Sequence, residues 1–414
     1  MTAALVALAL FVQAPAEKIA EIRVHGNVTM PDALVIQLAG VAVGGTLDAD
    51  GIAAIEKRLR DSGRFDEVQV RKRYRTLAMD EVALVVLVHE KPGVTQTGEP
   101  PSLLRQLRTR LMFFPILYYD DGYGWTYGAQ TSVVNVFGKG TRVAVPLSWG
   151  ATKAARLDVD RTFKSGPLTR ATASFGIQQR ENPHFLVDDR RVSLKGRAER
   201  RFFNVFTLGT DLTRTQLTFE PTHDRFWTPA ADATIDTRRD PAYPSDAVLA
   251  QIRWSRLSAI GTTAFGPSGS SIDRYMLDGR GYKRLFGQNV LALRTEYDTA
   301  SGPLPPYEQY LLEGWQLRGT RAGAFAGDKR FIWSAEVRMP LSSPLDTIGR
   351  AGLNVFLDGA TTALHGQRIF DQREQHGAGA GLWMILTVFQ FNVEVAHSLE
   401  GHGTRLQFGT GFSF

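Results

Sequence analysis

The sequence predicts a mostly β protein: a sixteen-stranded transmembrane antiparallel β-barrel preceded by one small α/β domain. Helical periodicity is confined to residues 18–92, whereas segments of about ten alternating polar and apolar residues recur over the following ~300 residues. The longest apolar runs, Ala3–Val12 and Leu382–Phe389, fall well short of the ~18 residues that a membrane-spanning helix needs. A membrane barrel explains both observations, because its strands alternate lipid-facing and lumen-facing side chains.

The composition limits the classes of protein and site that the chain can form. The 414 residues include 40 glycines and no cysteine, which excludes disulfides and thiolate metal sites. The net charge of +6 is small for this length and favours scattered, solvated Lys and Arg over a nucleic-acid interface. The sequence contains no base-reading motif, His-x-x-x-His pair, P-loop or Gly-x-Ser-x-Gly motif. We therefore expect no nucleic-acid partner, no cofactor, no metal and no enzymatic activity.

Residues 1–16 have features of an export signal. The apolar run Ala3–Val12 precedes Ala14-Pro15-Ala16, which has the small-x-small form of a signal-peptidase site. Cleavage after Ala16 would leave a mature chain that begins at Glu17. Only two residues precede the apolar run, so the usual basic region is missing, and a short buried helix is the alternative interpretation.

Residues 17–92 predict one domain with the order β-α-α-β-β. The expected elements are a strand over 18–24, helices over 32–39 and from a capping Asp48 or Asp50 to 59, and strands over 65–75 and 81–89. Pro31 and Gly40 delimit the first helix, and Gly63 ends the second. Several Pro and Gly residues over 93–108 then predict a linker.

Residues 109–414 are expected to form the barrel. Counting back from Phe414 gives sixteen segments, which begin near residues 404, 388, 377, 351, 329, 289, 272, 247, 232, 205, 190, 168, 154, 140, 124 and 109. An even number allows an antiparallel single-chain barrel to close with both of its ends on one side. A soluble β-sandwich also alternates, but such long alternation without an intervening helix favours the membrane barrel.

The N-terminal unit resembles a POTRA domain of the BamA/TamA superfamily, which includes the transporters of two-partner secretion. Besides the order of elements, the resemblance rests on residues Ile22–Asn27, Leu59–Val68 and Val88–Lys91. Members of this superfamily carry one to several such domains, and this chain carries a single copy.

Three barrel motifs extend the resemblance over nearly the whole chain. Asp236-Thr237-Arg238-Arg239-Asp240 resembles the Asp-Thr-Arg-Asp strand of the family, although Asp246 stands where a following glycine is usual. Leu317-Arg318-Gly319-Thr320 resembles the tip of the long sixth extracellular loop, with Thr320 in place of an aromatic residue. Phe356-Leu357-Asp358-Gly359-Ala360 resembles the strand motif whose acidic residue binds the arginine of that loop.

Arg318 is the first candidate functional residue. An arginine on a loop that folds into the lumen needs an anion there, and a planar guanidinium suits a bidentate carboxylate. Alternation places Asp358 and Glu336 on the lumen face of their strands. We predict a lock in which Arg318, next to Gly319, pairs with Asp358 and has Glu336 nearby; the alternative is a solvent-exposed loop arginine. The resemblance implies that this lock positions the loop and is needed for activity.

Two strands are candidate binding surfaces. The last segment has Leu406, Phe408, Phe412 and Phe414 on one face, and it resembles the signal that outer-membrane barrels present to their assembly machinery; the alternative is a simple closing strand. The strand 65–75 of the POTRA-like unit contains Val68 and Val70. If this strand is a sheet edge, as in the family, an extended client can add to it by backbone pairing.

The resemblance implies a non-enzymatic outer-membrane assembly or translocation factor with its POTRA domain in the periplasm. Client strands would pair at a weak lateral seam between the first and last barrel segments. The implied partners are the outer-membrane lipid bilayer, unfolded client polypeptides, and periplasmic proteins or lipoproteins. A passive porin-like channel and a surface antigen are the alternatives, and protein insertion, polypeptide secretion and lipid handling all remain open.

Overall fold

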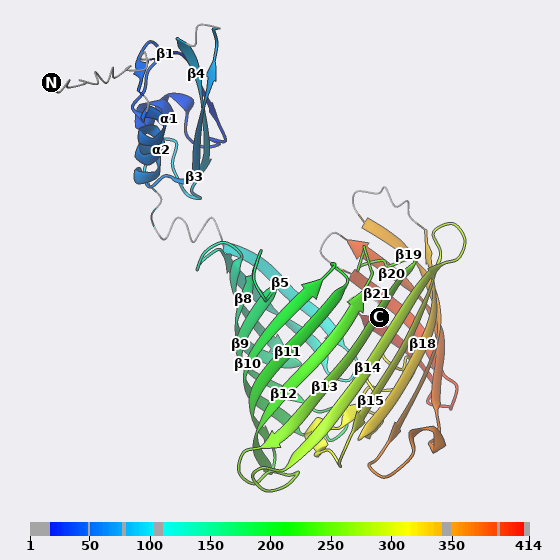
Figure 1. Ribbon diagram of the computed structural model, residues 1–414. Helices are drawn as coiled ribbons and strands as arrows, with labels where there is room; N and C mark the ends of the chain where they lie inside the picture. The colour runs from blue at the N-terminus through cyan, green and yellow to red at the C-terminus, as the bar shows by residue number, and fades with distance from the viewer. Residues whose placement is uncertain are drawn as a thin grey trace, which may run out of the picture. The chain divides into compact units, whose positions relative to one another are not determined.

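The computed structural model describes residues 17–48, 50–76, 80–100, 102, 111–341, 349–386 and 390–409 (Figure 1). The expected signal segment 1–16, part of the expected linker 93–108, and both Phe412 and Phe414 lie outside these residues. The chain divides into two compact units, Met1–Leu111 and Met112–Phe414. Neither described α-helix is long and apolar enough to cross a membrane.

The N-terminal unit packs two helices on one face of a four-stranded sheet (Figure 1). Its elements are β1 Glu17–His25, α1 Asp32–Ala39, β2 Thr46–Leu47, α2 Gly51–Asp61, β3 Phe65–Tyr74 and β4 Glu81–Glu90. The sheet order is β2-β1-β4-β3, so β3 lies at an edge. The predicted α/β fold is confirmed, and the sequence missed only the two-residue β2, which is too short to show a periodic pattern.

Both helices are followed by a left-handed glycine as predicted, and α1 begins at the predicted residue, but the N-terminal cap of α2 differs from expectation. Gly40 adopts a left-handed conformation with φ of 65°, and its N–H bonds to the carbonyls of Ile36 and Gln37. Asp50 stands at the N-cap of α2, but its side chain makes no capping hydrogen bond. Its φ of −95° and ψ of 4° depart from the extended conformation that directs a capping side chain to the helix, so the predicted carboxylate cap is wrong.

The core of this unit supports a stability prediction. Leu84 on β4 is fully buried against Ile55 and Leu59 of α2, within a single apolar cluster. We expect residues 17–92 to fold as an isolated fragment, and Leu84→Ala to destabilise it by about 2–5 kcal/mol through lost burial and a residual cavity. Urea unfolding followed by circular dichroism measures this change, with the exposed Val43→Ala as a control expected to change little. Random-coil amide shifts for the wild-type fragment would contradict the prediction.

The second unit is a sixteen-stranded antiparallel barrel in which each strand pairs with its neighbours along the chain (Figure 1). The first eight strands are β5 Leu111–Asp120, β6 Gly124–Val134, β7 Thr141–Gly150, β8 Thr152–Thr162, β9 Arg170–Glu181, β10 Asp188–Phe202, β11 Phe206–Phe219 and β12 Thr222–Asp236. The others are β13 Ala247–Ala259, β14 Ser271–Arg284, β15 Val290–Ala300, β18 Lys329–Pro340, β19 Gly349–Ala363, β20 Gln375–Leu386, β21 Gln390–Ser398 and β22 Thr404–Gly409. The predicted fold class and strand number are confirmed.

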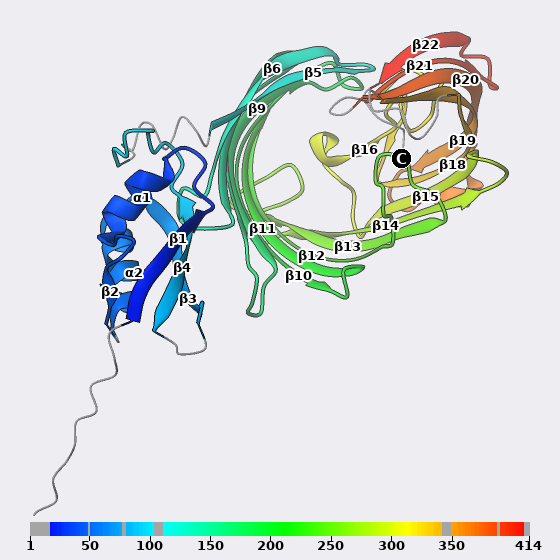
Figure 2. The same ribbon diagram turned by 90° about the horizontal axis from the view of Figure 1, so that it is seen from above.

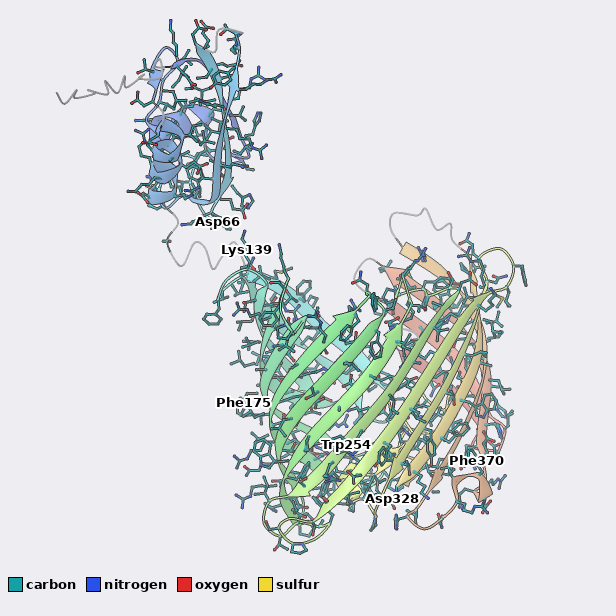
Figure 3. All side chains as sticks on the ribbon, in the orientation of Figure 1. Asp66, Lys139, Phe175, Trp254, Asp328 and Phe370 are labelled. Atoms are coloured by element: carbon teal, nitrogen blue, oxygen red, sulfur yellow. The ribbon has the colours of Figure 1, made fainter. Side chains whose placement is uncertain are left out.

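The wall separates apolar outer side chains from polar inner ones. Phe175 on β9 points away from the barrel and is 48% exposed (Figure 3). On β19, Leu353, Val355 and Leu357 are exposed, whereas Asn354 and Asp358 are buried on the inner side. This alternation is typical of a barrel with a lipid-facing exterior and a polar lumen.

One predicted strand boundary is wrong. Fifteen described strands begin within two residues of their predicted starts, but β12 begins at Thr222 instead of near 232. Pro229 lies inside β12, although a proline normally interrupts a strand because it has no N–H to donate. Here Pro229 still lies opposite Leu212 of β11, while the pairing of β12 with β13 skips Thr228 and Pro229. The strand therefore continues through the proline.

Candidate functional site

The segment 301–328 between β15 and β18, here called the lumen loop, folds inside the ring of strands (Figure 2). It joins the eleventh and twelfth strands of the barrel, where the family resemblance places the long sixth loop. Within it, the 3-10 helix η1 Pro306–Glu308 is followed by a small hairpin of β16 Tyr310–Leu311 with β17 Ala326–Gly327. Buried side chains along the loop show that it is packed; they include Leu304, Tyr307, Leu312 and Leu317.

Arg318 lies at the centre of a buried ionic cluster and is 1% exposed. Its Nε and Nη2 donate to the two carboxylate oxygens of Asp358 at 2.7 and 2.8 Å. Its Nη1 donates to Glu336 at 2.7 Å and to Glu394 at 3.1 Å. The structure therefore brings Arg318, Asp358 and Glu336 together in the bidentate geometry that favours arginine over lysine. We call Arg318 with these three carboxylates the Arg318 lock.

The lock also depends on close packing of the loop tip against the wall. The guanidinium carbon of Arg318 lies 3.4 Å from the ring centre of Phe356, a cation–π contact. Gly319 has φ of 89°, and a Cβ there would lie 2.9 Å from the backbone of His397 and Ser398 on β21. A Cβ on Gly377 of β20 would collide with the carbonyl oxygen of Arg318. Glycine is therefore required on both sides of this contact.

Sequence reasoning missed several members of the cluster. Glu394 on β21 accepts from both Arg318 and Asn354, and Ser334 on β18 donates to Asp358 at 2.6 Å. Arg338 donates to Glu336 at 2.7 Å. Alternation of polar and apolar residues indicates that Glu394 lies on the polar face of its strand, but only the spatial order of β18, β19, β20 and β21 brings it to Arg318.

A second ionic anchor holds the other half of the lumen loop. Glu308 of η1 accepts from Arg191 of β10 at 2.8 Å and from Arg274 of β14 at 2.5 Å. The hydroxyl of Tyr307 donates to Asp224 of β12, and its ring stacks on Phe226. The loop is thus pinned to strands β10, β12 and β14 as well as to the Arg318 lock. No predicted site residue belongs to this Glu308 anchor.

The predicted barrel motif forms a separate cluster at the other end of the barrel. Arg238 donates to Asp236 through Nε and Nη2, both at 3.0 Å. Asp240 accepts the backbone N–H of Ala242 at 3.1 Å and pairs with Arg350 of β19 at 3.0 Å. Asp236, Arg238 and Asp240 therefore shape the turn between β12 and β13.

The first and last barrel strands form a seam. β5 and β22 are the two ends of the hydrogen-bonded strand order, and no backbone pairing joins them among the described residues (Figure 2). Side chains bridge them instead: Arg405 pairs with Asp121 at 3.3 Å, and the rings of Tyr119 and Phe408 meet edge-on at 6.4 Å. Gln407 of β22 also donates to the carbonyl of Gly314 at 3.1 Å, which connects the seam to the lumen loop.

The remaining predicted residues lie on the two candidate binding strands. Leu406 and Phe408 are on the outer face of β22 and are exposed. Val68 and Val70 are on the edge strand β3, with their side chains buried in the core of the N-terminal unit. These two strands belong to different compact units of the chain.

Two family models match the chain. The POTRA model, described as a surface antigen variable number repeat, matches residues 17–91, and the Omp85 superfamily domain matches residues 227–414. A comparison with curated protein sequences gave no significant match.

Solved structures share the fold at low sequence identity. BamA from Haemophilus ducreyi lacking POTRA domains 1–3 has a TM-score of 0.63 and 14% identity, with 95% of this chain and 84% of that chain covered. CdiB from Escherichia coli has a TM-score of 0.52 and 12% identity, with 99% of this chain and 92% of that chain covered. CdiB from Acinetobacter baumannii has a TM-score of 0.50 and 12% identity, with coverages of 97% and 74%. The POTRA unit, the sixteen-stranded barrel and both family models together show that this chain belongs to the Omp85 superfamily of outer-membrane barrels, with BamA and TamA.

Proposed function

We propose that this protein inserts or translocates client polypeptides at the outer membrane by opening the seam between β5 and β22. The POTRA unit lies in the periplasm and delivers the clients, and the process needs no cofactor and no covalent chemistry. The observation that carries the proposal is the seam itself, because its two strands are joined by side chains across the described residues. A client strand can pair with backbone groups that no neighbouring barrel strand occupies.

The energies of the seam contacts favour opening at this place. A single, partly exposed ion pair such as Arg405–Asp121 contributes on the order of 1 kcal/mol, and an aromatic contact such as Tyr119–Phe408 about 0.5–1.5 kcal/mol. Neighbouring strands elsewhere are held by backbone ladders; β21 and β22, for example, are paired from Asn392–Gly409 to His397–Thr404.

The lumen loop argues against a passive channel. It is packed inside the barrel and held by both the Arg318 lock and the Glu308 anchor. An open porin needs a water-filled path instead. Surface recognition would require exposed loops, whereas this longest loop between barrel strands is buried over much of its length.

A reversible crosslink across the seam tests the proposal. The chain has no cysteine, so Tyr119→Cys with Phe408→Cys introduces the only two thiols. We expect a short, reducible bifunctional thiol reagent to stop client assembly and a reductant to restore it, because a covalent bridge prevents strand separation. Folding of client barrels is measured by heat-modifiable migration on gels.

The matched control places the same crosslink between strands that are already paired. Leu208→Cys with Ala233→Cys joins opposite positions of β11 and β12, so crosslinking there should leave client assembly unchanged. Undiminished assembly with a fully crosslinked seam would rule out lateral opening between β5 and β22.

A further inference from the structure

The edge strand of the POTRA unit is partly closed by the adjacent helix. The N–H of Val70 donates to the Glu56 carboxylate at 2.9 Å, and the carbonyl of Val68 accepts from Arg60 at 3.3 Å. Glu56 and Arg60 also pair with each other at 2.6 Å, one turn apart on α2. These two side chains occupy backbone groups of β3 that a neighbouring strand would otherwise use. We call Glu56 and Arg60 the α2 cap.

The alternation of an antiparallel pair shows which backbone groups of β3 point outward. Successive residues direct their N–H and C=O groups alternately toward and away from the paired strand. Val70 donates to α2, away from β4, whereas Arg75 donates to the carbonyl of Glu81 next to β4. Residues 68, 70, 72 and 74 are therefore the outward positions. The α2 cap binds the carbonyl of Val68 and the N–H of Val70, and Lys72 and Tyr74 lie beyond it.

The uncapped end of β3 is strongly basic. Arg71, Lys72, Arg73 and Arg75 lie in succession around Tyr74, and none of these four side chains is buried. Lys72 and Tyr74 both contact Glu17 of β1, at 2.8 and 2.7 Å, on the helix side of the sheet. Arg71 and Arg73 lie on the other face, opposite Val85 and Ala83 of β4. A strand added beside β3 would place its own side chains next to these two arginines.

We propose that clients pair with the Lys72–Tyr74 end of β3, that the α2 cap is a displaceable cover over Val68 and Val70, and that the fitting client segment is extended and acidic. This inference rests on the proposed delivery of clients by the POTRA unit and adds the position and charge of the pairing. At Val68 and Val70 a client first has to displace the α2 cap, because the carbonyl of Val68 and the N–H of Val70 are bonded to it. Acidic residues beside Arg71 and Arg73 stabilise the added strand, and basic residues oppose it.

The cap is in place at neutral pH. The Val70 N–H, and secondarily Arg60, hold the pKa of the Glu56 carboxyl below its ordinary value. Glu56 is therefore ionised near pH 7 and keeps both of its contacts. A client that extends from Tyr74 toward Phe65 has to replace these contacts with its own backbone groups.

Hydrogen exchange of the full-length protein in detergent micelles tests this assignment. The probes are two synthetic decapeptides, one alternating Thr and Glu and the other alternating Thr and Lys. We expect the acidic peptide to slow amide exchange within residues 65–75 at a roughly three- to tenfold lower concentration than the basic peptide. Arg71→Glu with Arg73→Glu should reverse this preference. Arg23→Glu, on the same sheet face but two strands away, should preserve it.

A second experiment removes the α2 cap. Glu56→Ala with Arg60→Ala should speed exchange of the Val70 amide without peptide, and should tighten acidic-peptide binding about three- to tenfold. Lys57→Ala, exposed on the same helix, should do neither. Equal binding of both peptides, or unchanged binding without the cap, overturns this inference but leaves the seam crosslink to decide the proposed function. No protection by either peptide, with or without the cap, overturns client pairing at this edge altogether.

Discussion

Arg318→Ala is expected to release the tip of the lumen loop and to abolish client assembly while the barrel remains folded in the membrane. The substitution leaves Asp358, Glu336 and Glu394 buried around a site that has lost its central cation. Removing one partner of a buried ion pair costs ~3–5 kcal/mol, because the remaining charges are not resolvated. We expect this cost to loosen the packing of the lumen loop. The backbone hydrogen bonds between the barrel strands do not change.

Protease access to residues 301–328 measures the release, and the folding of client barrels measures the function. Arg318→Lys should rescue poorly, because an ammonium group cannot bind both oxygens of Asp358 and also reach Glu336. Arg321→Ala is the matched control: it removes an exposed arginine from the same loop and should behave as wild type. A protected loop and normal client assembly in Arg318→Ala would show that the lock has no functional role.

The parts of the fold that follow from local periodicity could be predicted from the sequence. Alternation over ten-residue segments gave the sixteen strands and put Asp358 and Glu336 on the lumen side. The early start of β12 was not predicted, because the sequence does not show that the strand continues through Pro229 while its pairing with β13 skips two residues. Where the structure departs from the predictions, contacts between segments remote in sequence decide the outcome.

In the candidate site, too, some residues can be identified from local motifs, and others only from contacts between remote segments. Arg318 and Asp358 lie in recognisable local motifs, and the lumen parity of Asp358 supported the predicted pairing. Glu394 is separated from Arg318 by 76 residues, and nothing in its own segment distinguishes it from other lumen-facing carboxylates. The contacts of Val68 and Val70 with α2 were missed for a related reason: apolar alternation describes side chains, whereas Glu56 and Arg60 bind backbone atoms.

The Glu308 anchor gives the prediction that best separates an assembly factor from a channel. Glu308→Gln should loosen the η1 half of the lumen loop and raise the conductance of the barrel in planar bilayers, from low and flickering to larger openings. The carboxylate bridges two arginines, and a hydrogen bond to a charged group contributes about 1.5–3 kcal/mol, so a neutral amide weakens the hold of η1 on both Arg274 and Arg191, although Arg191 keeps its pair with Asp189.

Adding Tyr307→Phe removes the hydroxyl that donates to Asp224 and should increase the conductance further. Glu313→Gln is the control, because this carboxylate contacts Trp315 within the same loop and its loss leaves the anchor intact. Since the Arg318 lock is preserved in these variants, client assembly should decline less than in Arg318→Ala. A wide, steady conductance already present in the wild type, and unchanged by Glu308→Gln, would mean that the lumen loop does not close the barrel and would favour the passive channel.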